Sequence, residues 1–116
     1  MQYLLMAHSA ENAWATMTPD QHQQGMAAYM AYNEALKAAG VLKSADRLAP
    51  TSAGATVRVI EGKTQVVDGP YAEAKEQFGG YFLIEVADLD AALAWAARCP
   101  AASHGAVEVR QVWANT

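Results

Sequence analysis

The sequence predicts an α+β fold in which one antiparallel β-sheet carries two helices on one face. Short stretches rich in branched and aromatic residues indicate strands, and two longer stretches space their apolar residues as amphipathic helices do. These segments follow one another as strand, helix, four strands, helix and strand, which is the ferredoxin-like order. Of the 116 residues, 53% are hydrophobic and 17% charged, so residues 1–116 are expected to form a single domain around one core.

The first helix is defined by its end signals. Residues 12–18 read as a loop, and Thr18 and Gln21 then have the spacing of a capping box. The helix is expected to continue until Gly40 ends it in a left-handed conformation. Its predicted half-buried stripe consists of His22, Met26, Tyr29, Asn33 and Leu36.

The remaining elements follow from alternation and turn residues. Strands are predicted over residues 2–8, 41–48, 56–60, 64–67, 81–86 and 106–113, with the third and fourth forming a hairpin. Asp88 is expected to cap a second helix that Pro100 prevents from continuing. The apolar stripe predicted for this helix is Leu89, Ala92, Leu93 and Ala96.

The sheet face turned away from the helices is predicted to be partly apolar. Strand alternation predicts that the side chains facing the helices are Phe82, Ile84, Val86, Val107 and Val109. The opposite face then combines Tyr81, Leu83, Glu85, Glu108 and Arg110. A bare sheet face normally alternates to polar residues, so this mixture indicates a covered interface. We therefore predict a homodimer through the sheet faces; a monomer with scattered surface apolar residues is the alternative.

Charge and cysteine content exclude several classes of protein. The net charge is −4 and the eight Lys and Arg residues are scattered singly, so no nucleic-acid partner is expected. No apolar run approaches ~20 residues and the start lacks a basic leader, so we expect a cytoplasmic protein with no membrane partner. Cys99 is the only cysteine and the histidines lack ligand spacing, so no metal and no other cofactor is expected.

Residues 68–76, with the sequence DGPYAEAKE, concentrate three carboxylates and one lysine before a pair of glycines. Asp-Gly-Pro is typical of a turn, and the proline is expected to open a helical turn with Glu73 and Glu76 on one side. If the segment lines a pocket, Lys75 can bind a substrate anion while Glu73 or Asp68 acts as a base. The alternative is a structural turn locked by capping and an ion pair across a dimer; the carboxylate spacing matches no known metal loop.

This segment closely resembles the signature of the DGPF (DGPFAETKE) family, a branch of the YCII-related proteins. The similarity continues through residues 77–86, 88–92, 97–100 and 107–110 and covers essentially the whole chain, with Tyr71 where the family usually has phenylalanine. The resemblance implies a ferredoxin-like fold that dimerises through its sheets as a dimeric α+β barrel. It also implies a sigma factor of the extracytoplasmic-function type as a partner.

The wider family is associated with a histidine–aspartate pair, and the resemblance places these two positions at Ala28 and Cys99. The chain therefore departs from the family where such an acid–base pair would stand, and His22 lies about a turn and a half too early to replace the histidine. His8, at the end of the first strand, is read as a structural histidine. His104 is read as a surface residue of a flexible loop.

Three functions stay open on the sequence. The first is a small-molecule-binding or regulatory module whose binding residues are Asp68, Tyr71, Glu73, Lys75, Glu76 and Arg110. The second is a small acid–base enzyme of the isomerase, lyase or dehydrochlorinase kind, with Asp68 or Glu73 as base and Lys75 or Arg110 stabilising an oxyanion. The third is an interaction protein that contacts a sigma factor. For Arg110, an ion pair in the interface is the alternative to anion binding.

Overall fold

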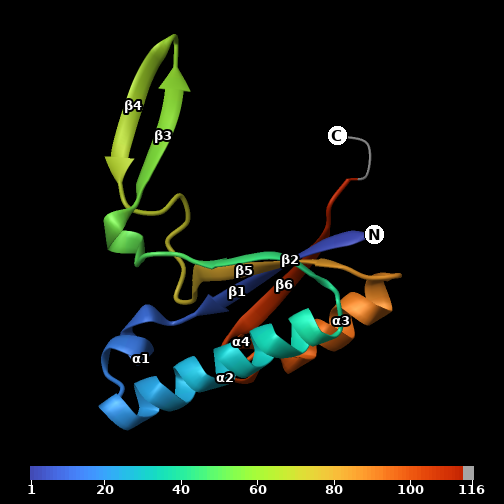
Figure 1. The fold of residues 1–116 in the computed structure, drawn as a ribbon. Helices are drawn as coiled ribbons and strands as arrows, with labels where there is room; N and C mark the ends of the chain where they lie inside the picture. The colour runs from blue at the N-terminus through green and yellow to red at the C-terminus, as the bar shows by residue number, and fades with distance from the viewer. Residues whose placement is uncertain (114–116) are drawn as a thin grey trace.

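The computed structural model describes residues 1–113 and confirms the predicted fold class (Figure 1). Within these residues, four strands form an antiparallel sheet in the order β2-β5-β1-β6. The strands are β1 Gln2–Ser9, β2 Leu42–Arg47, β5 Gln77–Glu85 and β6 Ala106–Gln111. The helices α2 (Pro19–Ala38) and α3 (Leu89–Arg98) both lie on one side of this sheet.

The hydrophobic core lies between the sheet and these helices. Its buried members include Tyr3, Leu5, Tyr32, Leu36, Phe82, Ile84, Ala92 and Ala96. The Tyr32 hydroxyl donates to the Trp95 carbonyl oxygen at 2.7 Å, and the Tyr32 ring meets Phe82 edge-on at 5.0 Å. Tyr32 therefore ties α2 to α3 and to the sheet, while its polar tip keeps a hydrogen-bond partner.

The local signals for α2 are confirmed. The Thr18 hydroxyl accepts from the Gln21 backbone N–H and the Gln21 side chain accepts from the Thr18 N–H, which completes the capping box. Gly40 has a φ of 73°, the left-handed conformation that a glycine adopts without strain.

The predicted stripes of both helices are confirmed in part. In α2, the structure confirms His22, Tyr29, Asn33 and Leu36 as half-buried or buried, whereas Met26 is 53% exposed and Tyr32 is buried in addition. Glycine at position 25 is needed because a Cβ there would lie 3.0 Å from the Trp14 ring. In α3, Leu89 and Leu93 are 48% and 47% exposed, because the small Ala92 and Ala96 bring the helix backbone close to the sheet.

Two short helices replace predicted loops. The first, α1 (Glu11–Ala15), stands within the segment expected to be a loop, and α4 (Ala101–His104) lies before β6. Trp14 of α1 stacks on the His22 ring with centroids 4.6 Å apart, and the Arg47 guanidinium lies 4.9 Å from the Trp14 centroid. These contacts come from segments distant in sequence, so local propensity did not predict this helix.

The predicted hairpin is confirmed and stands apart from the sheet. β3 (Ala55–Ile60) and β4 (Lys63–Asp68) pair only with each other and follow the short 3-10 helix η1 (Thr51–Ala53). Figure 1 shows the hairpin projecting on the side of the sheet opposite to the helices. The radius of gyration is accordingly 16.1 Å, against roughly 13 Å for a compact chain of this length.

Burial makes the stability of the fold sensitive to high pH. It raises the pKa of Tyr29 from 10.0 to about 12, and it also raises the pKa of Tyr32. Since the folded-state pKa lies above the unfolded one, the stabilisation is complete below pH 10 and is lost as the pH rises toward 12. We expect the free energy of urea unfolding to fall across this window, and to fall less steeply in Tyr29→Phe. The exposed Tyr71 supplies the control Tyr71→Phe, and an unaltered profile for Tyr29→Phe would contradict the assignment.

Candidate functional site

One end of the sheet carries an open hollow of about 740 Å³. The hollow lies where β1 ends, where β6 begins and where the chain enters β5. Its lining residues are His8, Ala10, Ala74, Lys75, Glu76, His104, Ala106, Val107 and Glu108. Segments that are distant in the sequence therefore bring two imidazoles, one ammonium group and two carboxylates to a partly apolar surface.

A β-bulge sets the position of His8. Ala7 pairs with Gly80 but His8 pairs with Phe78, so Gly79 is an extra residue in β5. The bulge places Phe78 on the same side of the sheet as His8, and the two ring centroids are 5.6 Å apart. Bulges commonly redirect a side chain next to a functional site.

Gly105 allows His104 to reach the same hollow. His8 pairs with Ala106 across β1 and β6, so the end of α4 lies against the end of β1. The Gly105 N–H donates to the Ala101 carbonyl oxygen at 2.7 Å and closes α4. A Cβ at position 105 would collide with the carbonyl oxygen of His8. The two backbones can therefore approach this closely only because residue 105 has no side chain.

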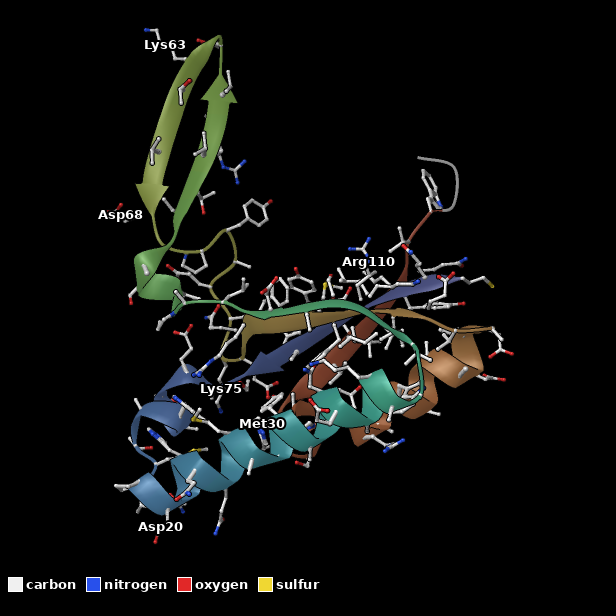
Figure 2. The ribbon with its side chains drawn as sticks, viewed as in Figure 1. Asp20, Met30, Lys63, Asp68, Lys75 and Arg110 are labelled. Atoms are coloured by element: carbon white, nitrogen blue, oxygen red, sulfur yellow. The ribbon has the colours of Figure 1, made fainter. Side chains whose placement is uncertain are left out.

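The residues of the acidic segment 68–76 lie in two separate parts of the structure. Lys75 and Glu76 line the hollow, whereas Glu73 is exposed outside its lining. Asp68 ends β4 at the base of the hairpin, and Figure 2 shows it well apart from Lys75.

The predicted helical turn in this segment is wrong, because residues 70–76 form bends without a helix. The segment must run from the hairpin base back to Gln77, and a helix rises only ~1.5 Å per residue. Tyr71 stays at the hairpin base, where its ring centroid lies 5.1 Å from the Arg58 guanidinium.

The uncovered sheet face adjoins the hollow. Register places Met6 between Tyr81 and Glu108, and Leu4 between Leu83 and Arg110. No element within residues 1–113 lies over this face in Figure 1. The apolar centre is thus bordered by charges, as the strand alternation predicted.

Two pairings organise the polar rim of that face. Arg110 Nε lies 3.6 Å from Glu108 Oε2, so the same carboxylate borders the hollow and pairs with the guanidinium. At the opposite edge, the Tyr81 hydroxyl donates to Asp46 Oδ2 at 2.9 Å, and this bond raises the pKa of Tyr81. Figure 2 shows Arg110 on the side of the sheet away from the helices.

Sequence reasoning missed the joint placement of the two histidines. The sequence favours a structural role for His8 and a surface position for His104; His104 is exposed, yet both residues line one hollow. The order of the elements held the signal, because a first and a last strand that pair antiparallel bring the end of one beside the start of the other. The positions matched to the family's pair carry no such chemistry: Ala28 is exposed on α2 and Cys99 is buried.

Burial raises the pKa of the Cys99 thiol, which keeps the group uncharged in the core. Among the described residues, no group of three or more His, Cys, Asp or Glu side chains is placed to hold a metal ion. Over the same part of the chain, no helix has both the length and the apolar character needed to cross a bilayer.

The substitution Gly105→Ala tests the close approach at the hollow. We expect it to lower the free energy of unfolding by about 1–3 kcal/mol, because the added methyl group meets backbone rather than a movable side chain. Gly54→Ala is the control, since a Cβ there would lie 3.4 Å from the Thr51 carbonyl oxygen, an ordinary contact, and should change stability by less than about 0.5 kcal/mol. Equal urea-unfolding midpoints for the two variants would refute this packing of α4 against β1.

Comparisons with known proteins agree with this architecture. A protein of Rhizobium meliloti (strain 1021) described as uncharacterized is 38% identical over 112 residues, which is 95% of this chain and 90% of that protein. The solved structure of 5-chloro-2-hydroxyhydroquinone dehydrochlorinase from Burkholderia phenoliruptrix AC1100, in complex with 2,5-dihydroxybenzoquinone, superposes with a TM-score of 0.53. It covers 97% of this chain and 94% of that one at 18% identity, a likeness of fold. The model of the YCII-related domain matches residues 1–115, and the chain therefore belongs to the YCII-related family.

Proposed function

We propose that this chain acts as a homodimer that binds a small organic molecule in the hollow at the end of its sheet. The convergence of Lys75, His8 and His104 with Glu76 and Glu108 on one hollow carries the proposal. A volume of about 740 Å³ suits a ligand of the size that proteins bind in clefts of roughly 300–1,000 Å³.

The lining also specifies the chemistry of that ligand. Lys75 supplies a compact positive charge for a carboxylate or phenolate oxygen. The carboxylates of Glu76 and Glu108 accept hydrogen bonds from hydroxyl groups, and the imidazoles donate or accept. Alanine and valine side chains form the rest of the wall, so the ligand class is a small hydroxylated acid or phenol with an apolar part.

The exposed surface supports the homodimer. The chain exposes 8104 Å², whereas a compact monomer of 12.4 kDa exposes roughly 6,100 Å². The excess of about 2,000 Å² is larger than the ~800 Å² that each partner buries in a standard interface. Packing two copies face to face would bury the apolar centre formed by Leu4, Met6 and Leu83, and an isologous pair leaves no further sheet face open.

A second candidate function is acid–base catalysis at the same hollow. The observation that favours it is the presence of His8 and His104 beside two carboxylates, because imidazole transfers protons near neutral pH. The dehydrochlorinase named above shares the fold and, by its name, removes chloride from a chlorinated hydroxyhydroquinone. As an enzyme, the protein would therefore bind a small hydroxylated ring in this hollow and transfer a proton to or from it. A sigma-factor partner stays a prediction of the family resemblance.

Ligand binding is tested by calorimetry with a panel of hydroxybenzoates, hydroquinones and aliphatic hydroxy acids. We expect at least one to bind, and Lys75→Ala to weaken binding roughly tenfold or more through loss of a charge-assisted contact. Lys37→Ala is the matched control, because Lys37 is an exposed residue of α2 that does not line the hollow. The proposal fails if no compound binds, or if both lysine variants lose the same affinity.

The homodimer is tested by sedimentation equilibrium at micromolar concentration. We expect a dimer for the unmodified chain and a monomer for Leu83→Asp, which buries an unpaired carboxylate between the sheets. The control Leu93→Asp changes an exposed leucine of α3 on the helix side and should leave the dimer intact. A monomeric unmodified chain would rule the homodimer out.

A further inference from the structure

We infer that the β3–β4 hairpin is an arm that grips the second copy of the chain through one of its two faces. The inference rests on the proposed homodimer and adds to it an element outside the sheet. Register divides the hairpin into two faces. The inner face comprises Thr56, Arg58, Ile60, Lys63, Gln65 and Val67; the outer face comprises Ala55, Val57, Val59, Thr64, Val66 and Asp68.

The inner face overlooks the uncovered sheet face. Figure 1 shows the loop after β4 on the side of the hairpin nearer to the sheet, and Tyr71 of this loop lies against Arg58 of the inner face. Asp68, an outer-face residue, points to the other side in Figure 2. The inner face and the uncovered sheet face are therefore two walls of one corner, and a body that covers the sheet meets the hairpin as well.

The hairpin has the composition of a covered element. A two-stranded hairpin alone is marginally stable in water and needs a further packing surface. Every residue of β4 is nevertheless exposed, and Tyr71 at its base is 77% exposed. Exposed apolar side chains on a projecting hairpin are typical of an interaction site, and here they lie on both faces: Ile60 and Val67 on the inner face, and Val57, Val59 and Val66 on the outer face.

Charge identifies the second copy as the occupant. The inner face carries Arg58 and Lys63 and, in its strands, no carboxylate. The uncovered sheet face of another copy presents three carboxylates at its rim, Asp46, Glu85 and Glu108, and one guanidinium, Arg110, which pairs with Glu108. In a twofold pair each arm meets the body of the other subunit, so both arms gain the same opposite-charge contacts.

The inner face also carries a small pocket, called the socket below, that can accommodate a side chain of that second copy. A small hollow of about 150 Å³ opens at the base of the arm, lined by Thr56, Arg58, Gln65, Val67, Pro70 and Tyr71. Val67 lies at this hollow, whereas its neighbour Val66 points to the outer face. A substitution at one valine therefore changes the socket while the same substitution at the other does not.

The adjacent valines provide the experiment, since both are 62% exposed in the single chain. Sedimentation equilibrium is performed on the full chain, on Val67→Asp and on Val66→Asp. We expect Val67→Asp to raise the dimer dissociation constant roughly tenfold or more, because it buries a carboxylate against a carboxylate-rich rim. Val66→Asp is expected to change it by less than about twofold, since exposed substitutions away from an interface have small effects.

Arg58→Glu, which reverses a charge on the inner face, is expected to weaken the dimer more at low salt than at high salt. Far-UV circular dichroism and melting curves check that the core of each variant stays folded. A dimer whose dissociation constant is the same for the unmodified chain and Val67→Asp overturns the arm alone. A stronger effect of Val66→Asp than of Val67→Asp overturns the assignment of the inner face. A monomeric unmodified chain overturns the homodimer and the arm together.

Discussion

The central position of β1 is the constraint on which the rest of the structure depends. β1 lies between β5 and β6, so its backbone groups are paired on both sides. Its alternate residues serve opposite faces: Tyr3 and Leu5 fill the core, while Leu4 and Met6 form the middle of the uncovered face. Its last residues bring His8 to the hollow. One strand thus fixes the register of the core, the open face and the site. A slip of one residue would turn the core side chains of β1 to the open face and the open-face side chains to the core, and it would displace His8 from the hollow.

The hollow depends on how the chain reaches the two strands that flank β1. β5 is reached through residues 74–76 and carries the Gly79 bulge, and β6 is reached through α4 and Gly105. The approach to β6 relies on a residue without a side chain, because a Cβ at Gly105 would collide with the His8 carbonyl oxygen. The approach to β5 is redirected by the bulge at Gly79. Backbone geometry therefore decides which polar side chains lie around the hollow.

The structural features that depend on residues close together in the sequence could be predicted from the sequence. The capping box at Thr18, the left-handed Gly40 and the β3–β4 hairpin are encoded within a few residues, and all were predicted. Strand alternation likewise predicted which side of β5 enters the core, because a period of two leaves no other choice.

What the sequence did not predict depends on contacts between distant segments. In α2, Gly25 lies against the Trp14 ring while Met26 is exposed, and no local rule ranks that glycine above Met26 as a sheltered position. The division of residues 68–76 follows from the distance between the hairpin base and β5 rather than from any property of the motif. Predicting the hollow would have required two pieces of information. The pairing of β1 with β6 can be inferred from the order of the elements, but the position of the end of α4 against His8 is known only from the folded backbone.

The small size of the core links the fold to the proposed assembly. Of the residues that the structure describes, the large side chains that are fully buried are Leu5, Leu36 and Ile84, joined by Cys99; the rest of the buried core consists of three aromatic residues, Val86 and four alanines. Because hydrophobic stabilisation scales with the apolar area removed from water, a core built on alanine gains less per ordered residue than one built on leucine. The sheet face and the hairpin hold further large apolar side chains outside the core, among them Leu83, Val57 and Val59. Their burial against a second copy would add the missing area where the single chain already places many of its larger apolar residues.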